Sequence, residues 1–306
     1  MTVLTAVARL QHNRIINGFM VVLLVWPIAA TDAKTIDGDV LLAPDRLVEI
    51  RLELDQADWR ELCRQARDPA AAFSGLPSEN PYSYFKADLW IDGEKIPSVG
   101  VRKKGFIGSS DQQRPSLKIK FDQFVQQDPI AGLSRLTLNN NKQDRSQMSQ
   151  FLVYQLFRKA GNPAPRSNWA HVTVNGQNLG IYSNVESIKN PFLERAFDDK
   201  TGNLYEGTLT DFHPQTIDRI EVKNNDDTND LSDLQRLTDL LAGGGDLDLE
   251  ELEKIIDLDS FIRYWTIESL TGFWDGYCSN QNNFYVYFSP KHDDRAYFIP
   301  WGADWA

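Results

Sequence analysis

The 306 residues suffice for one large domain or two modest ones, and the 8 Trp, 10 Tyr and 16 Phe argue against intrinsic disorder over most of the chain. The net charge of −11 argues against a protein that binds nucleic acid or anionic membranes through clustered Lys and Arg. The first segment predicts targeting: Arg9 and Arg14 precede an apolar run over 19–30 and then small residues, the order of a secretory signal peptide. We therefore predict a signal peptide over 1–33 and export to the cell surface, the periplasm or the medium. An uncleaved anchor is the alternative, although the run is short for a membrane span.

Strand patterns dominate the first half of the remaining chain. Alternating apolar and charged residues over 47–54 predict a half-buried strand, and Asp55 is placed to cap a helix that extends to about residue 67. Residues 84–104 return to a strand pattern with Asp92-Gly93 as a tight hairpin turn. Further strands are predicted over 116–121 and 136–138.

Helices dominate the second half. Asp144 or Ser146 is predicted to cap a helix that ends at residue 160, and Asn175-Gly176 predicts a hairpin between strands at 169–174 and 179–185. Helices are then predicted over 191–197, 232–241, 249–256 and 260–273. Strands followed by helices predict an α+β fold, with two lobes as one arrangement.

The densest group of polar residues follows the last of these helices. Asp275 begins a loop that also holds Asn280 and Asn283, and an aromatic strand over 284–288 leaves this loop. Asp304 follows another short strand. Protein kinases place a loop Asp five residues before a metal-binding Asn, which is the spacing from Asp275 to Asn280. The alternative is that these asparagines only satisfy the backbone of a turn.

Basic residues near a loop of small side chains indicate a second feature. Arg102 ends a strand that runs into a loop with Ser109 and Ser110, and backbone N–H groups of such a loop can bind phosphate. Lys118 and Lys120 share one face of the following strand, where a lysine can reach the phosphates of a nucleotide. The alternative is a solvated strand edge guarded by lysines.

The order of these motifs resembles the CotH family of atypical, exported kinases. The resemblance covers roughly residues 85 to 306, from the Arg, Ser-Ser and Lys pattern of 100–120 to the Pro300-Trp301 motif with Asp304. It implies a reduced, two-lobed protein-kinase-like fold of the α+β class, with a C-terminal lobe that is apparently truncated. The implied domains are an N-terminal strand-helix extension over 34–84, an N-lobe with the phosphate-binding loop over 85–187, and an incomplete helical C-lobe over 188–306.

The resemblance also implies a function and roles for the residues. It implies transfer of the γ-phosphate of ATP to Ser or Thr hydroxyls of secreted or coat proteins, with Mg²⁺ or Mn²⁺ as the metal. Asp275 would be the catalytic acid of the loop. Asn280 or Asn283 would bind the metal together with Asp304. The nucleotide would contact Arg102, Lys118 or Lys120, the loop of Ser109 and Ser110, and a hinge near Glu186.

Two departures from the family pattern favour a second interpretation. The family writes its last motif as Pro-Trp-Asp-x-Asp, and Gly302 stands here at the first Asp. The helix over 146–160 contains no acidic residue to pair with the strand lysine, which leaves Glu186 as a candidate partner. The alternative function is therefore a catalytically inactive coat, matrix or assembly protein with the same fold. A glycan hydrolase, which needs two carboxyl groups flanking a sugar cleft, ranks third.

Overall fold

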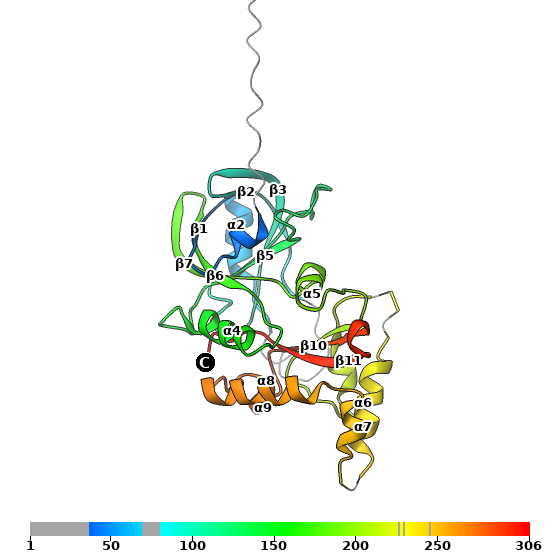
Figure 1. Ribbon diagram of the computed structural model, residues 1–306. Coiled ribbons are helices and arrows are strands. Elements are labelled where there is room, and N and C mark those ends of the chain that lie inside the picture. Colours follow the sequence, from blue (N-terminus) through cyan, green and yellow to red (C-terminus); the bar gives the residue numbers. More distant parts are fainter. Residues whose placement is uncertain (1–36, 69–79, 226, 229, 245) are drawn as a thin grey trace, which may run out of the picture. The chain divides into compact units, whose positions relative to one another are not determined.

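The computed structural model describes residues 37–68, 80–225, 227–228, 230–244 and 246–306 (Figure 1). The predicted signal peptide over 1–33 lies outside these residues. Residues Lys34–Ala306 form one compact unit that mixes helices with two sheets, which confirms the α+β class.

Seven strands close into a barrel in the order β1-β2-β3-β4-β5-β7-β6. Their bounds are β1 Leu47–Leu54, β2 Phe85–Ile91, β3 Glu94–Lys103, β4 Leu117–Lys120, β5 Arg135–Asn139, β6 Ser167–Val174 and β7 Gln177–Val185. Inward-facing aliphatic side chains from every strand fill the interior, as the alternation of Val48, Ile50 and Leu52 along β1 illustrates. The predicted strands are confirmed, with ends that differ by a few residues.

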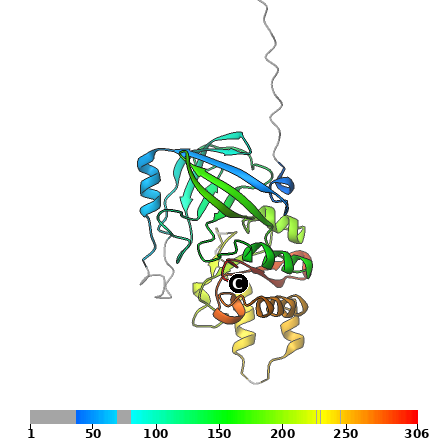
Figure 2. The same cartoon turned by 90° about the vertical axis from the view of Figure 1, so that its left-hand side faces the viewer.

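The first strand closes the barrel. β1 pairs antiparallel with β2 and parallel with β6, where Leu47 lies opposite Trp169 (Figure 2). The strand predicted within the N-terminal extension is therefore part of the same sheet as the strands that follow residue 85.

Both predicted hairpin turns are confirmed. Asp92 and Gly93 join β2 to β3 with φ of 49° and 88°, and Asn175 and Gly176 join β6 to β7 with φ of 49° and 78°. Positive φ at both central residues is the requirement of the type I′ turn, and Asn, Asp and Gly adopt it at low cost.

A second sheet lies in the part of the chain predicted to be mainly helical. Its order is β11 (Arg295–Pro300), β10 (Phe284–Ser289), β8 (Leu204–Gly207) and β9 (Glu221–Val222). β10 and β11 confirm the two strands predicted for the aromatic run of 284–288 and before Asp304. β8 and β9 were not predicted, because strands of four and two residues are too short to show a period.

Helices cover both faces of this sheet. Phe284 and Phe288 pack with α4 (Ser149–Lys159), α6 (Ser232–Ala242) and α8 (Leu258–Thr271), whereas Tyr285 and Tyr287 pack with α5 (Asn190–Phe197). The remaining helices are α1 (Gly38–Leu41), α2 (Gln56–Arg64), α7 (Leu249–Glu253), α9 (Tyr277–Asn280), η1 (Ile217–Arg219) and η2 (Pro290–His292).

Aspartate side chains accept hydrogen bonds from free backbone N–H groups at the starts of α2 and α4. Asp55 caps α2 by accepting from the backbone N–H groups of Ala57 and Asp58, as predicted, although α2 ends at Arg64 rather than near residue 67. α4 begins at Ser149, a few residues later than predicted, and its N-cap residue is Met148 rather than Asp144 or Ser146. Asp144 still accepts from the backbone N–H of Ser149 at 2.7 Å. Of the helices in the described ranges, none has the length and apolar character needed to cross a membrane.

Candidate active site

Asp275 lies at the centre of a group of asparagine side chains. Its Oδ1 accepts from Nδ2 of Asn280 at 2.6 Å and of Asn282 at 3.1 Å, and its Oδ2 accepts from Nδ2 of Asn283 at 2.8 Å. The single turn of α9 returns the chain toward Asp275, which is why a spacing of five residues gives a direct contact. The structure thus brings together Asp275, Asn280 and Asn283.

A buried glutamate of α8 holds this loop. The carboxylate of Glu268 accepts from the backbone N–H of Cys278 at 2.8 Å and of Tyr277 at 3.3 Å, and burial raises the Glu268 pKa. A Cβ atom on Gly276 would lie 2.4 Å from Oε1 of Glu268, so the close approach requires glycine. No role was predicted for Glu268, because in the sequence it is one polar residue within a helix.

Asp304 brings a second carboxylate toward the first. Burial raises the Asp304 pKa, and the like-charged carboxylates of Asp275 and Asp144 add to this, whereas Lys104 acts in the opposite direction. The last strand, β11, ends at Pro300 and so delivers Asp304 to the region of the Asp275 loop. These carboxylates would repel one another unless cations lay among them.

Lys104 is the cation whose charge acts on the carboxylate of Asp304. Its ammonium group donates to Oδ1 of Asn139 and lies 5.7 Å from the ring centroid of Trp301. Burial lowers the Lys104 pKa to about 8, while Asp304 opposes that change. No role was predicted for Lys104, although it lies two residues after Arg102 and so on the same side of the extended chain at the end of β3.

The intervening residue, Lys103, faces the other way. Its side chain is buried, and Nζ donates to the backbone oxygens of Cys63 at 2.7 Å and Gln65 at 2.8 Å. Lys103 therefore ties the end of α2 to the barrel, and only Arg102 and Lys104 of this basic run share the face of the candidate site.

The structure separates the two lysines of β4. Lys118 lies opposite Arg102 across the β3–β4 ladder, and burial, followed by the charge of Arg102, holds the Lys118 pKa well below its usual range. Lys120 instead lies 3.7 Å from Asp122, at the far end of the strand. Lys118 is thus the lysine of β4 that belongs with Arg102 and Lys104.

Glu206 of β8 is an acidic neighbour of Lys118 that sequence reasoning missed. Burial acts to raise the Glu206 pKa, but its ion pair with Lys223, together with Tyr285 and Lys118, holds the pKa below its usual value. Because β8 is a four-residue strand far from β4 in the sequence, only the tertiary fold reveals this neighbour.

Glu186 was a candidate partner for the strand lysine, but the structure places it with two arginines. Its fully buried carboxylate pairs with Arg166 at 2.9 Å and with Arg195 at 2.6 Å, and it also accepts from the backbone N–H of Arg166. The side chain is committed to this ion-pair cluster, so an adenine contact at this position would have to use the backbone around it.

The loop with Ser109 and Ser110 is compact. Ser116 N–H donates to Ser109 O at 2.8 Å, and the amide of Asn140 donates to Gly108 O at 3.1 Å. The Ser110 N–H donates to Phe106 O at 2.9 Å within the loop. A phosphate contact by Ser110 would therefore use the hydroxyl group rather than the backbone.

The donor set suits magnesium. Within the described ranges, no three His, Cys, Asp or Glu side chains form a metal-binding group. Asp275 and Asp304 do lie within electrostatic reach of each other, and Asn283 adds an amide oxygen beside Gly302. Mg²⁺ binds through one or two carboxylates and completes its shell with water and substrate phosphates, so these residues fit it.

Known proteins are similar in sequence to the part of the chain that contains the candidate site. The family described as CotH kinase protein matches residues 101–306. The inner spore coat protein H of Bacillus subtilis is 24% identical over 242 residues, which are 72% of this chain and 64% of that protein. Invasin CotH2 of Rhizopus delemar is 24% identical over 188 residues, which are 56% of this chain and 32% of the invasin. The inner spore coat protein H-like protein of Bacillus subtilis is 29% identical over 172 residues, or 56% of this chain and 48% of that protein. The chain therefore spans between about a third and two thirds of these relatives. The family match covers more than half of the chain, and the chain belongs to the CotH kinase protein family.

Proposed function

We propose that the chain is an exported protein kinase with a reduced, two-lobed kinase-like fold, which transfers the γ-phosphoryl group of ATP to Ser or Thr hydroxyls of secreted or coat proteins. The observation that carries the proposal is that Lys104 and Asp304 act on each other, because these two residues connect two groups of side chains. Asp304 lies within electrostatic reach of Asp275, which bonds to Asn280 and Asn283, and Lys104 lies within electrostatic reach of Arg102 and Lys118.

Each group has a distinct role in the proposed reaction. The hydroxyl oxygen of the substrate attacks the γ-phosphorus, the bond from that phosphorus to the β–γ bridging oxygen breaks, and ADP leaves. Asp275 orients the attacking hydroxyl and accepts its proton. Arg102, Lys104 and Lys118 neutralise charge on the phosphate oxygens, which is where most of the rate enhancement of phosphoryl transfer arises.

Asp304, with Asn283 or Asn280, is the proposed holder of the metal. A bound Mg²⁺ or Mn²⁺ would supply positive charge to the phosphates and would relieve the repulsion among the carboxylates. The raised pKa of Asp304 supports this assignment, because the carboxylate is placed where its own charge is disfavoured without a cation.

A second candidate function is a non-catalytic coat or assembly protein, and Gly302 favours it. Gly302 stands where the family motif has an Asp, and a Cβ atom there would lie 2.8 Å from Oδ1 of Asn283. The backbone at Gly302 has φ of 61°, so a carboxylate at this position would be strained as well as crowded.

Thermal unfolding with ATP, measured without metal, with Mg²⁺ and with Mn²⁺, separates the two functions. A ligand that binds only the folded state raises the melting temperature as its concentration passes its Kd. We expect a metal-dependent rise for the wild type and its loss in Asp304→Asn. No rise with either metal, in a sample that unfolds cooperatively, would favour the non-catalytic function. A rise without subsequent phosphorylation of casein or a coat-protein extract would favour a nucleotide-binding protein that does not catalyse transfer.

A further inference from the structure

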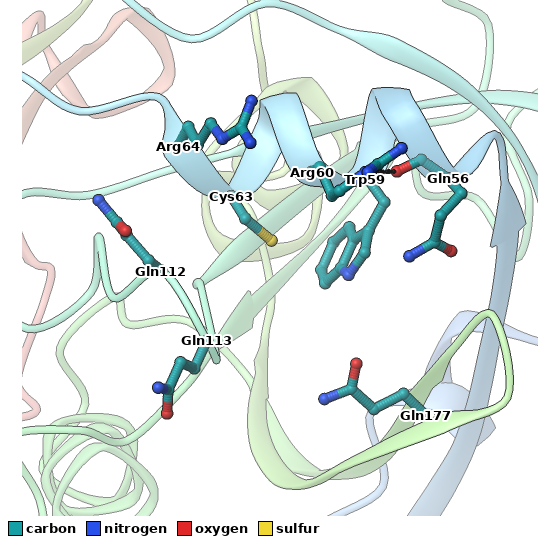
Figure 3. Close-up of a pocket in the computed structure, with 8 residues that line it drawn as sticks. All are labelled: Gln56, Trp59, Arg60, Cys63, Arg64, Gln112, Gln113 and Gln177. Atoms are coloured by element: carbon teal, nitrogen blue, oxygen red, sulfur yellow. Dashed lines mark hydrogen bonds between the residues drawn. The ribbon is translucent and has the colours of Figure 1, made fainter.

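A recess lies between α2 and the barrel. It has a volume of about 410 Å³, and its wall comes from α2, from the loop that precedes β4, and from Gln177 at the start of β7. Figure 3 shows Trp59 and Cys63 pointing from α2 into this space, with Gln113 and Gln177 on the opposite side. The volume is within the range of small-ligand sites, roughly 300–1,000 Å³.

The charged side chains that line the recess are both positive. Arg60 and Arg64 line it from successive turns of α2, and no carboxylate is among the residues that form the wall. In the ranges that the structure describes, neither guanidinium group forms an ion pair. Of the acidic residues of α2, Asp58 lies away from both arginines around the helix, whereas Glu61 is the i−3 neighbour of Arg64 but is not among the residues that form the wall. The recess is therefore a local positive site on a chain of net charge −11.

Unused amide groups converge on the same space. The side chains of Gln112, Gln113 and Gln177 line the recess and make no hydrogen bond to another described residue. Each primary amide offers two N–H donors and one acceptor oxygen, which matches the alternating N–H and C=O groups of a peptide backbone. Burial raises the pKa of the Cys63 thiol to about 11, so the thiol adds no negative charge.

We propose that this recess binds an acidic peptide in an extended conformation, with two carboxylate side chains at alternate positions paired to Arg60 and Arg64. Residues four apart on a helix have Cβ atoms about 5–6 Å apart. Alternate residues of an extended strand lie on one face about 6.6–6.8 Å apart, because the rise is about 3.3–3.4 Å per residue. A Glu-x-Glu segment therefore matches the two guanidinium groups, while Gln112, Gln113 and Gln177 take the peptide backbone.

Trp59 argues against an acidic sugar as the occupant. Carbohydrate sites commonly offer an open aromatic face, whereas Trp59 is only 6% exposed and packs into the barrel core. The proposal does not rest on kinase activity, because no residue of this recess belongs to the candidate active site.

Fluorescence anisotropy with labelled pentapeptides tests the proposal on the purified chain. The probe is fluorescein-Ala-Glu-Ala-Glu-Ala, compared with the isomer Ala-Ala-Glu-Glu-Ala and with a version in which both Glu are Gln. We expect the alternating peptide to bind at least about fivefold more tightly than its isomer, and the Gln version to bind at least about tenfold more weakly. Equal affinity for the two isomers would overturn the extended register, and absence of binding at millimolar peptide would overturn the site.

Matched variants assign the binding to the recess. The double variant R60Q/R64Q removes two exposed cations and should weaken the alternating peptide about tenfold. The control K86Q/K159Q removes the same charge from exposed residues of β2 and α4 outside the recess, and should bind as the wild type does. An equal loss in both would identify general charge attraction and overturn the assignment, as would binding of trigalacturonate in preference to the peptide. Unchanged melting temperatures of both variants establish that folding is not the cause.

Discussion

The side-chain amide of Asn280 donates a hydrogen bond of 2.6 Å to the carboxylate of Asp275, five residues earlier in the chain. One turn of helix separates the two residues, and Asn283 donates to the second oxygen of the same carboxylate at 2.8 Å. An acceptor held by several amides has a fixed orientation, and fixed orientation is what a residue that positions an attacking hydroxyl needs.

Asp275→Asn should therefore abolish phosphoryl transfer while nucleotide affinity stays within a few-fold of wild type. The expected loss in kcat is about 10²–10⁴-fold, the usual contribution of a positioned acid or base. Single-turnover transfer of radiolabelled phosphate and a nucleotide titration measure the two quantities separately. Asp259→Asn, an exposed change in the first turn of α8, is the matched control. A wild-type rate in Asp275→Asn would remove the catalytic assignment.

Lys104 should make nucleotide binding depend on pH. The pKa of about 8 means that the ammonium group loses its proton above that pH, so affinity for ATP should fall by up to about tenfold per pH unit. Lys104→Arg should bind with little change from pH 7 to 9.5, because a guanidinium group stays protonated. Lys104→Met should bind weakly at every pH. Calorimetric titrations across this range measure the affinities, and a wild-type profile in Lys104→Met would exclude the residue from the site.

Lys104 should also make the free energy of unfolding depend on pH, but here the protonated form is the unfavourable one. The folded state binds the Lys104 proton more weakly than the unfolded chain does, so the charged lysine costs stability below pH 8. That cost should disappear between about pH 8 and the ordinary lysine pKa of about 10.4. Urea titrations at several pH values should show a free energy of unfolding that rises over this window relative to Lys104→Met.

Glu268 should act as a positioning residue for the Asp275 loop. Glu268→Ala leaves the backbone N–H groups of Tyr277 and Cys278 without their acceptor, at a cost of about 1–3 kcal/mol in the free energy of unfolding. We expect kcat to fall while the KM for ATP changes little. Glu268→Gln retains an acceptor oxygen and should recover most of kcat. If Glu268→Ala lowers stability but leaves kcat unchanged, the residue supports the fold alone.

Gly302 should be sensitive to a single methyl group. Gly302→Ala places a Cβ atom 2.8 Å from Oδ1 of Asn283 at a residue with φ of 61°, so it should lower stability by about 1–2 kcal/mol and weaken metal-dependent nucleotide binding. Gly161→Ala is the control, because Gly161 has φ of 84° but no atom lies within 4 Å of the added Cβ. The control should lower stability without affecting the metal dependence. If both variants changed the metal dependence equally, the contact between residue 302 and Asn283 would have no specific role in metal binding.

Local sequence signals predicted the local structure well. Asp92-Gly93 and Asn175-Gly176 determine their hairpins through backbone conformations that few other residue pairs adopt, and the alternation of β1 reports directly on burial. The loop spacing of Asp275 and Asn280 was visible for the same reason, since one turn of helix connects them.

Relationships between distant segments were not predictable in this way. Periodicity places Lys118 and Lys120 on one face, but only the position of β8 makes Glu206 a neighbour of Lys118. Lys104 lies beside Asp304 because β11 ends there, and Glu186 bonds to Arg166 and Arg195 because three elements meet. Each of these depends on packing between elements, about which the spacing of residues along one element says nothing.

The parallel pairing of β1 with β6 has a consequence for synthesis and for the choice of fragments. A nascent chain exposes one edge of β1 until the residues of β6 have been synthesised, because Leu47 pairs with Trp169 across the β1–β6 ladder. Closure over so long a sequence separation is slow compared with the formation of a hairpin. A fragment that began at residue 101, where the family match begins, would cut β3 and lack both β1 and β2. Such a fragment would present open strand edges on the remainder of β3 and on β6 and would aggregate rather than fold, so the folding unit begins well before the segment that the family shares.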